Sequence, residues 1–140
     1  MIKRRKQKIT SPYGPRGNIF HKGVDLRCYN FLNWKKQPVV FPCDCYVLKV
    51  GYQEKWGYNV IARPVNGGDI VELKFIHLAD PRDNVNVKTM YEKGELIGYT
   101  MLTEYMKKTG YYEHLHFETW NLEGHEDPTI FFDEMEIKYA

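Results

Sequence analysis

Side chains that could bind one metal ion lie in two short strings, His21-Lys-Gly-Val-Asp25 and His114-Leu-His116. Structural zinc sites are usually closed by four protein ligands and rich in cysteine. Catalytic zinc sites instead keep three protein ligands, commonly two histidines and a carboxylate, and leave one position for water. The two strings offer this second kind of ligand set. Because zinc makes bound water reactive near neutral pH, they indicate a zinc-dependent hydrolase.

The spacing within each string can be compared with strand geometry. Residues two apart in a strand point to the same side, so His114 and His116 would face one cavity, and either or both could reach a metal ion or its water. His21 and Asp25 would lie about 13 Å apart in a fully extended strand, too far to share an ion bound at about 2 Å. The chain must therefore bend between them, and Gly23 permits the bend.

The elements that must position these residues are predicted to be mostly β-strands. Alternating and β-branched runs predict strands over 39–41, 46–51, 57–63, 70–78 and 114–120. Asn66-Gly67 predicts a hairpin turn between the third and fourth of these strands. Helical patterning is weak, and it is strongest over 103–108 and 129–133. The predicted fold class is therefore all-β, an antiparallel fold with short helices.

Alternation along the strand at 114–120 separates two faces. Leu115, Phe117 and Thr119 form a core-like face, so His114, His116 and Glu118 line the other side.

Two residues on the predicted strands have alternative interpretations. Glu118 would either accept a hydrogen bond from a ligand histidine or be an ordinary exposed carboxylate. His77 shares a face with Leu73 and Phe75, so it would be either a hydrogen-bonded core histidine or a catalytic one.

The metal-binding strings belong to an ordered series of motifs. The series is Ser11-Pro-Tyr-Gly14, His21-x-Gly-x-Asp25, Pro38-Val39, Phe75-Ile-His77-Leu78, Lys93-Gly94-x-x-Ile97-Gly98, His114-Leu-His-Phe-Glu118 and Asp127-Pro128. This order resembles the lysostaphin and LytM family of zinc endopeptidases, which cut peptide bonds in bacterial peptidoglycan. The resemblance covers roughly residues 9–132 of the chain.

The resemblance implies a fold and a division of roles. The fold would consist of antiparallel sheets enclosing a groove. Zinc would be bound by His21, Asp25 and His116, whereas His77 and His114 would act on the water and on the transition state. The sequence does not decide which of these two histidines is the general base. The substrates would be wall peptides, from either a cross-bridge or a stem.

Two segments depart from the family pattern, because the stretches 26–37 and 99–112 are longer than usual. Their aromatic residues Trp34 and Tyr105 are predicted to flank the groove and contact substrate; the alternative is that both are core residues. Tyr13 lies eight residues before His21. It would either donate to the developing oxyanion or only pack beside Gly14. His125, in a polar loop, is expected to be solvated.

Length and composition are those of one domain. With 140 residues, 43% of them hydrophobic, the chain is long enough to bury a core. The formal net charge is +2, and five of the 20 basic residues lie within the first eight positions. We therefore expect a basic tail over 1–8, an endopeptidase domain over 9–140, and no binding of nucleic acid. Three cysteines without a C-x-x-C motif indicate neither a disulfide framework nor a thiolate zinc site.

The expected place of action is the bacterial cell wall. No apolar run is long enough to span a membrane, and no signal-peptide segment follows the basic start. The chain would therefore come from a phage virion or lysin, or be a domain of a longer exported protein. Two other functions fit the same residues: an inactive family member that binds wall peptides or activates a partner hydrolase, and a zinc hydrolase with a different substrate.

Overall fold

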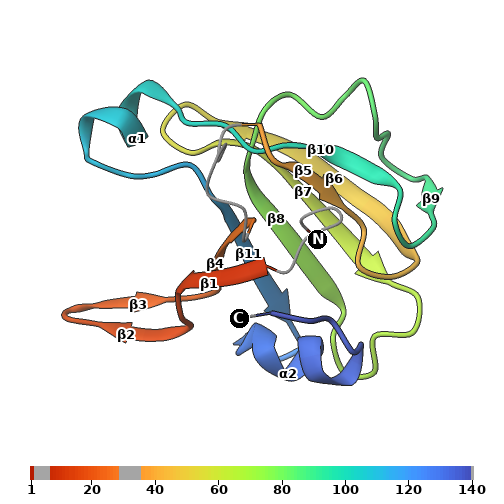
Figure 1. The fold of residues 1–140 in the computed structure, drawn as a ribbon. Helices are drawn as coiled ribbons and strands as arrows, with labels where there is room; N and C mark the ends of the chain where they lie inside the picture. The colour runs from red at the N-terminus through yellow and green to blue at the C-terminus, as the bar shows by residue number, and fades with distance from the viewer. Residues whose placement is uncertain (2–6, 29–35, 140) are drawn as a thin grey trace.

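The computed structural model describes residues 1, 7–28 and 36–139, and most of them lie in antiparallel β-structure (Figure 1). The elements in chain order are β1 (Gln7–Ser11), β2 (Gly14–Arg16), β3 (Ile19–His21), β4 (Val24–Cys28), β5 (Pro38–Val40), β6 (Cys45–Gln53), β7 (Gly57–Pro64), β8 (Glu72–Leu78), β9 (Met90–Tyr91), β10 (Leu96–Tyr99), α1 (Glu104–Lys108), β11 (Leu115–Trp120), β12 (His125–Glu126) and α2 (Pro128–Glu134).

One eight-stranded sheet organises the described part of the chain. Its strand order is β1-β4-β11-β8-β7-β6-β9, with β12 paired to β11, and two smaller ribbons are formed by β5 with β10 and by β2 with β3. The strand pairs are antiparallel. The predicted all-β class with short helices is thus confirmed, and each predicted strand overlaps an observed one.

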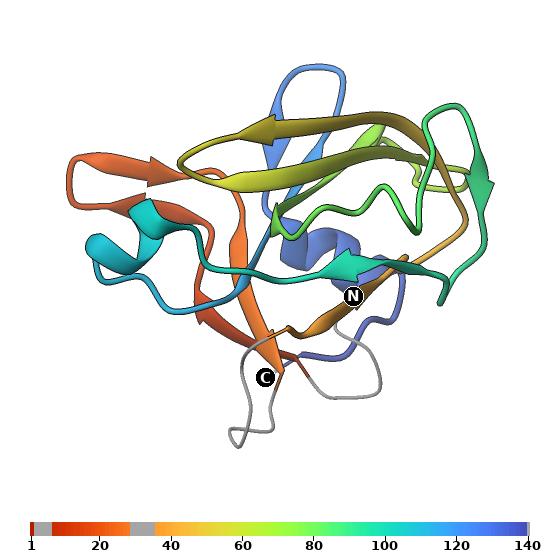
Figure 2. The ribbon, with the colours of Figure 1, turned by 90° about the horizontal axis from the view of Figure 1, so that it is seen from above.

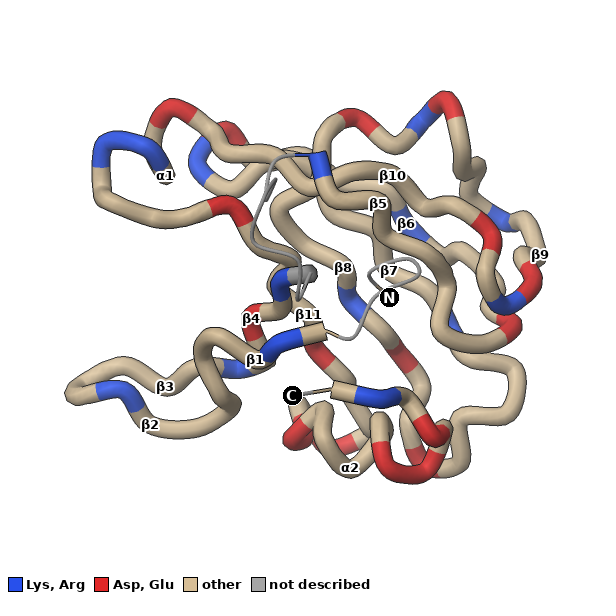
Figure 3. The backbone as a smooth tube through the Cα atoms, viewed as in Figure 1, with Lys and Arg blue, Asp and Glu red and all other residues tan. Residues whose placement is uncertain are grey.

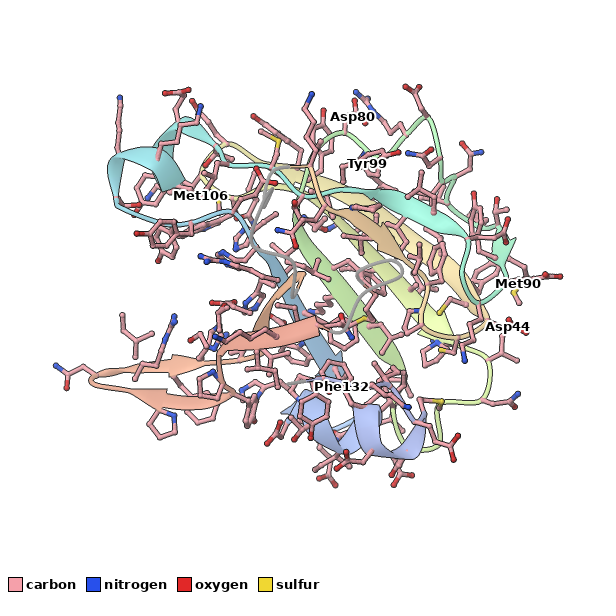
Figure 4. All side chains as sticks on the ribbon, viewed as in Figure 1. Asp44, Asp80, Met90, Tyr99, Met106 and Phe132 are labelled. Carbon is pink, nitrogen blue, oxygen red and sulfur yellow. The ribbon has the colours of Figure 1, made fainter. Side chains whose placement is uncertain are left out.

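The core lies between the sheet and a second layer made of the β5–β10 ribbon and α2 (Figure 2). Phe117 of β11 stacks on Phe132 of α2 at a ring distance of 5.7 Å, and Figure 4 shows Phe132 between the helix and the sheet. Phe75 of β8 meets Phe41, which follows β5, edge to face. These side chains are fully buried, so burial of large apolar surface fixes this face of the sheet as the inner one.

Both predicted helices are present, and each has a side-chain N-cap. Thr103 caps α1 by accepting a hydrogen bond from Met106 N–H, and Asp127 caps α2 by accepting one from Thr129 N–H. Met106 is the buried residue of α1, which projects from one end of the sheet (Figure 4). Within the described residues, no helix is long and apolar enough to span a membrane.

The N-terminal boundary differs from the prediction. β1 begins at Gln7, where Gln7 pairs with Cys28 and Lys8 with Arg27 of β4, so the last two residues of the predicted tail belong to the sheet. Met1 is buried, and its carbonyl accepts a hydrogen bond from Val40 N–H. Residues 2–6 lie outside the described residues. Basic and acidic positions are interspersed over the described elements (Figure 3).

Candidate metal centre and active site

The face of the sheet opposite the core carries the histidines, and strand pairing sets their spacing. β4 lies between β1 and β11, and its Asp25 is directly opposite His116 of β11. The predicted alternation of β11 is confirmed: Leu115, Phe117 and Thr119 are fully buried in the core. His116 therefore points away from the core and toward the carboxylate of Asp25.

His21 reaches the same place because the chain turns between β3 and β4. Gly23 lies in this turn, as the sequence indicated, but the reason for glycine is close approach and not a positive φ angle. A Cβ atom on Gly23 would lie 2.3 Å from the carbonyl oxygen of Phe117. The missing side chain lets the turn pack directly on β11, and this contact places His21 beside His116.

Three atoms from these residues converge on one point. His21 Nε2 lies 3.1 Å from Asp25 Oδ1 and 3.2 Å from His116 Nδ1, and the His116 and Asp25 atoms are 3.0 Å apart. Ligands of a tetrahedral zinc ion at about 2.0 Å would be separated by about 3.3 Å. The three predicted ligands therefore have the spacing that one small metal ion requires. Within the described residues, His21, Asp25 and His116 form a cluster that could hold such an ion.

The other ring nitrogens of both histidines are already engaged. His21 donates from Nδ1 to the carbonyl of Pro12 at 2.8 Å, and His116 donates from Nε2 to Glu118 Oε2 at 2.8 Å. These bonds leave His21 Nε2 and His116 Nδ1 as the ring nitrogens that face Asp25, and a metal ion would take the place of any proton on them. Glu118 is only 8% exposed. Of its two interpretations, the structure supports that of an acceptor for the ligand histidine.

The electrostatics of the cluster favour a cation. Burial alone would raise the pKa of Asp25, but hydrogen bonding to His116 and His21 keeps it well below its usual range. Burial would lower the pKa of His116, yet Asp25 at one ring nitrogen and Glu118 at the other raise it to about 9. Because the same field that attracts a proton attracts a metal ion, the two compete for this site.

His77 and His114 form a second pair beside the three converging atoms, with ring centroids 4.9 Å apart. Each ring donates from Nδ1 to a backbone carbonyl, His77 to Trp56 at 2.9 Å and His114 to Tyr112 at 2.7 Å. The Nε2 atoms are thus left as acceptors, and that of His114 lies 3.5 Å from Asp25 Oδ1. Burial is the main cause that lowers the pKa of His77, to about 3, and that of His114. Both rings are neutral at pH 7 and can accept a proton.

His77 reaches this pair through an irregularity in β8. Regular alternation would place it with Leu73 and Phe75 in the core, and Ile76 on the other face. The pairing of β8 with β7 skips His77, whose φ angle is +74°. An extra residue with positive φ is a β-bulge, which turns the side chain out of the regular pattern. Ile76 and His77 therefore both line the cavity on the side of the sheet that carries the other histidines.

A cavity of about 370 Å³ joins the two groups of histidines. It is lined by Arg16, Ile19, His21, Asp25, Trp56, Ile76, His77, Tyr111, His114, His116 and Glu118. All five predicted metal-binding and catalytic residues are in this set. Sequence reasoning missed four wall residues that belong to no recognisable motif: Arg16 and Ile19 of the β2–β3 hairpin, Trp56 of the turn between β6 and β7, and Tyr111 of the loop after α1.

The three predicted substrate contacts have different outcomes. Tyr13 is turned away from the cavity, because its hydroxyl is 2.8 Å from His125 Nδ1 and its ring packs on Phe20. His125 is correspondingly half-buried rather than solvated. Tyr105 of α1 is not one of the lining residues, but it packs edge to face on the lining residue Trp56 at a ring distance of 5.2 Å. Trp34 lies outside the described residues.

Comparison with known proteins points to one family. The sequence profile of peptidase family M23 matches residues 19–128, which include all five site residues. A comparison with curated protein sequences gave no significant match.

Several solved structures share the fold. The solution structure of lysostaphin aligns with a TM-score of 0.73 at 23% identity, covering 96% of this chain and 52% of that one. A structure of the SpoIIIAH–SpoIIQ complex aligns with a TM-score of 0.71 at 16% identity, covering 93% and 95%. A zinc-containing peptidase from Vibrio cholerae aligns with a TM-score of 0.67 at 20% identity, covering 86% and 35%. The chain thus spans about half the length of the lysostaphin chain.

Proposed function

The chain belongs to peptidase family M23, and from this premise we propose that it is a zinc-dependent endopeptidase acting on peptides of bacterial cell-wall peptidoglycan. One observation carries the proposal. Ligand atoms of His21, Asp25 and His116 converge to within 3.2 Å of one another, beside two buried histidines whose Nδ1 atoms donate to backbone carbonyls. This combination of a three-ligand set and two acceptors is what metal-assisted hydrolysis needs.

The donor set fits zinc. Two imidazole nitrogens and one carboxylate oxygen are the ligands of many catalytic zinc sites, and Glu118 fixes one imidazole as such sites require. His21, Asp25 and His116 would hold the ion. When bound, zinc supplies Lewis acidity, which activates water and polarises the scissile carbonyl.

His77 and His114 would move the protons. Their Nδ1–H groups are held by backbone carbonyls, so each Nε2 can accept a proton from the attacking water and return it to the leaving amine. His114 is the nearer of the two to Asp25. The other ring, once protonated, would stabilise negative charge on the tetrahedral intermediate. Neutral rings at pH 7 suit the first of these roles.

The substrate would be an extended peptide lying in the cavity between the β2–β3 hairpin and the loop that carries Trp56. Wall peptides, from cross-bridges or stems, are the substrate class that the sequence resemblance implies, and the protein would act at the cell wall. The partners of the chain would then be peptidoglycan peptides.

A second candidate is a family member that binds wall peptides or a partner protein without cutting. The fold is shared with a structure solved as a complex of two proteins, SpoIIIAH and SpoIIQ, which favours keeping this alternative. The full set of ligands and acceptors in this chain favours catalysis, because binding alone needs neither. Both candidates make clear and opposite predictions.

The test is metal analysis followed by incubation with purified peptidoglycan and mass spectrometry of the released fragments. We expect about one zinc ion per chain and new amino termini from one kind of peptide bond. Asp25→Asn, which removes a ligand charge without changing shape, is the matched control and should release nothing. Full zinc occupancy with no cleavage would support the binding candidate. A zinc-free parent protein would overturn the metal site itself.

A further inference from the structure

The two walls of the cavity differ in chemistry. One wall is the β2–β3 hairpin, which projects beyond the sheet (Figure 1) and contributes Arg16 and Ile19. The opposite wall is aromatic and contributes Trp56 and Tyr111. Ile19 is 69% exposed and lines the cavity. The hairpin therefore presents one cation and one apolar side chain to whatever occupies the cavity.

The guanidinium of Arg16 is oriented but accessible. Its Nη1 donates to Ser11 Oγ at 2.8 Å, which ties the side chain to β1. The side chain is still 44% exposed. A guanidinium has five N–H donors in one plane, and the hydrogen bond to Ser11 uses one of them. The remaining donors can form the paired hydrogen bonds that a carboxylate accepts.

The charges that line the cavity, together with a bound divalent cation, would leave the positive charge of Arg16 uncompensated. Two carboxylates line it, and both are engaged: Asp25 with His21 and His116, and Glu118 with His116 and Trp120. Among the described lining residues, Arg16 alone carries a permanent positive charge. With a divalent cation balancing the two carboxylates, as in the proposed function, the cavity is net positive. It will attract an anionic group.

The position of Arg16 separates it from the reacting atoms. Arg16 Nη1 lies 3.9 Å from Asp25 Oδ2. The metal-binding atoms and His114 instead gather around the other oxygen of Asp25, Oδ1. Arg16 therefore reaches a substrate group next to the scissile bond rather than the atoms that change bonding.

We infer that Arg16 is a specificity-determining residue that binds a substrate carboxylate, so that the enzyme prefers peptides with an acidic residue beside the cleaved bond. The inference rests on the proposed function and deepens it by naming the chemistry of the substrate. A neutral bridge peptide would leave the guanidinium with the contacts that it already makes, to Ser11 and Asp25. An acidic peptide would satisfy it and bind more tightly.

The experiment compares two synthetic wall peptides that differ only in whether the carboxyl group beside the cleaved bond is free or amidated. The parent should cleave the free acid with a kcat/KM at least ~10-fold higher, mainly through KM, as expected for a hydrogen bond to a charged group. Arg16→Gln should lower kcat/KM for the free acid to about that for the amidated peptide, and so remove this preference. Arg16→Lys should keep part of it, because lysine retains charge but not the paired geometry.

Lys22→Gln is the matched control, because Lys22 is exposed, close in sequence and outside the cavity lining. It should retain the parent's preference. An equal loss in Lys22→Gln and Arg16→Gln would show a general charge effect and overturn the inference. So would a parent with no preference, or an Arg16→Gln variant in which kcat falls equally for both peptides.

Binding measured without turnover separates this inference from the proposed function. Calorimetric titration of zinc-loaded His114→Ala with each peptide gives the preference directly, with and without the additional Arg16→Gln change. If the parent cleaves neither peptide, the proposed function fails. The inference still stands or falls on whether the free acid binds at least ~10-fold more tightly and loses this advantage with Arg16→Gln.

Discussion

Glu118→Gln is a small change at the residue that accepts a hydrogen bond from His116, on the ring nitrogen that faces away from Asp25. The Oε2 atom of Glu118 accepts a hydrogen bond from His116 Nε2–H at 2.8 Å, and Oε1 accepts one from Trp120 Nε1–H at 2.7 Å. A carboxylate can accept both. Glutamine has the same shape but only one acceptor atom, and its NH₂ group must face one of the two donors. The variant therefore loses a hydrogen bond whichever way the amide turns.

The size of the effect follows from which donor is lost. If the amide oxygen turns to Trp120, His116 loses its partner, and changes of this kind lower metal affinity by about 10- to 100-fold, or about 1.4 to 2.8 kcal/mol. If the oxygen turns to His116, an indole N–H faces a donor, at a cost to folding of roughly 1 to 3 kcal/mol. Loss of the carboxylate charge weakens metal binding in both orientations.

A second substitution separates these contributions. Trp120→Phe removes the competing donor and keeps an aromatic ring, so alone it should leave metal affinity close to that of the parent. In the double variant Glu118→Gln/Trp120→Phe, the amide oxygen is free to accept from His116, and part of the lost affinity should return. Zinc competition against a chromophoric chelator measures all four proteins, and urea denaturation measures their stabilities.

Two results would refute this reasoning. Parent-like zinc affinity in Glu118→Gln would mean that Glu118 does not orient His116. A double variant no tighter than Glu118→Gln, with Trp120→Phe itself benign, would mean that the two hydrogen bonds do not compete for one side chain.

Three further predictions test the site and its scaffold. His116→Ala should abolish zinc binding, whereas His114→Ala should keep zinc and slow hydrolysis by ~10² or more; equal zinc loss on dialysis would contradict the assignment. Gly23→Ala should cost roughly 1 to 3 kcal/mol in urea denaturation, because its Cβ would lie 2.3 Å from a carbonyl oxygen, whereas Gly98→Ala, with ordinary contacts, should cost little. The pKa of His77, lowered to about 3, lets the unfolded chain bind the proton first, so stability falls from pH 6.5 toward 3. His77→Gln should flatten that fall in melting temperature, and an unchanged profile would count against a neutral His77.

The strands that the sequence predicted are those in which apolar and polar residues alternate over enough positions to show a period. The side chains of β11 were assigned to the correct faces of the sheet. Its six residues alternate, and only one arrangement buries Leu115, Phe117 and Thr119. Strands β2, β3, β9 and β12 have two or three residues each, too few to show a period, and were not predicted. The cavity wall that β2 and β3 build was missed with them, including Arg16. Tyr13 was given a role in the site from its distance in sequence, but its turn directs the hydroxyl to His125 instead.

His77 shows most directly why pattern alone could not complete the site. The period of β8 groups it with Leu73 and Phe75, and no glycine marks the bulge that breaks this period. The positive φ of +74° is unfavourable for histidine and is held by contacts distant in sequence: its Nδ1–H donates to Trp56 O, and its carbonyl accepts from Met101 N–H. Glycine would relieve the strain but would bring no imidazole. The chain keeps the strained residue where the ring meets His114, which is the expected location if strain is retained for function.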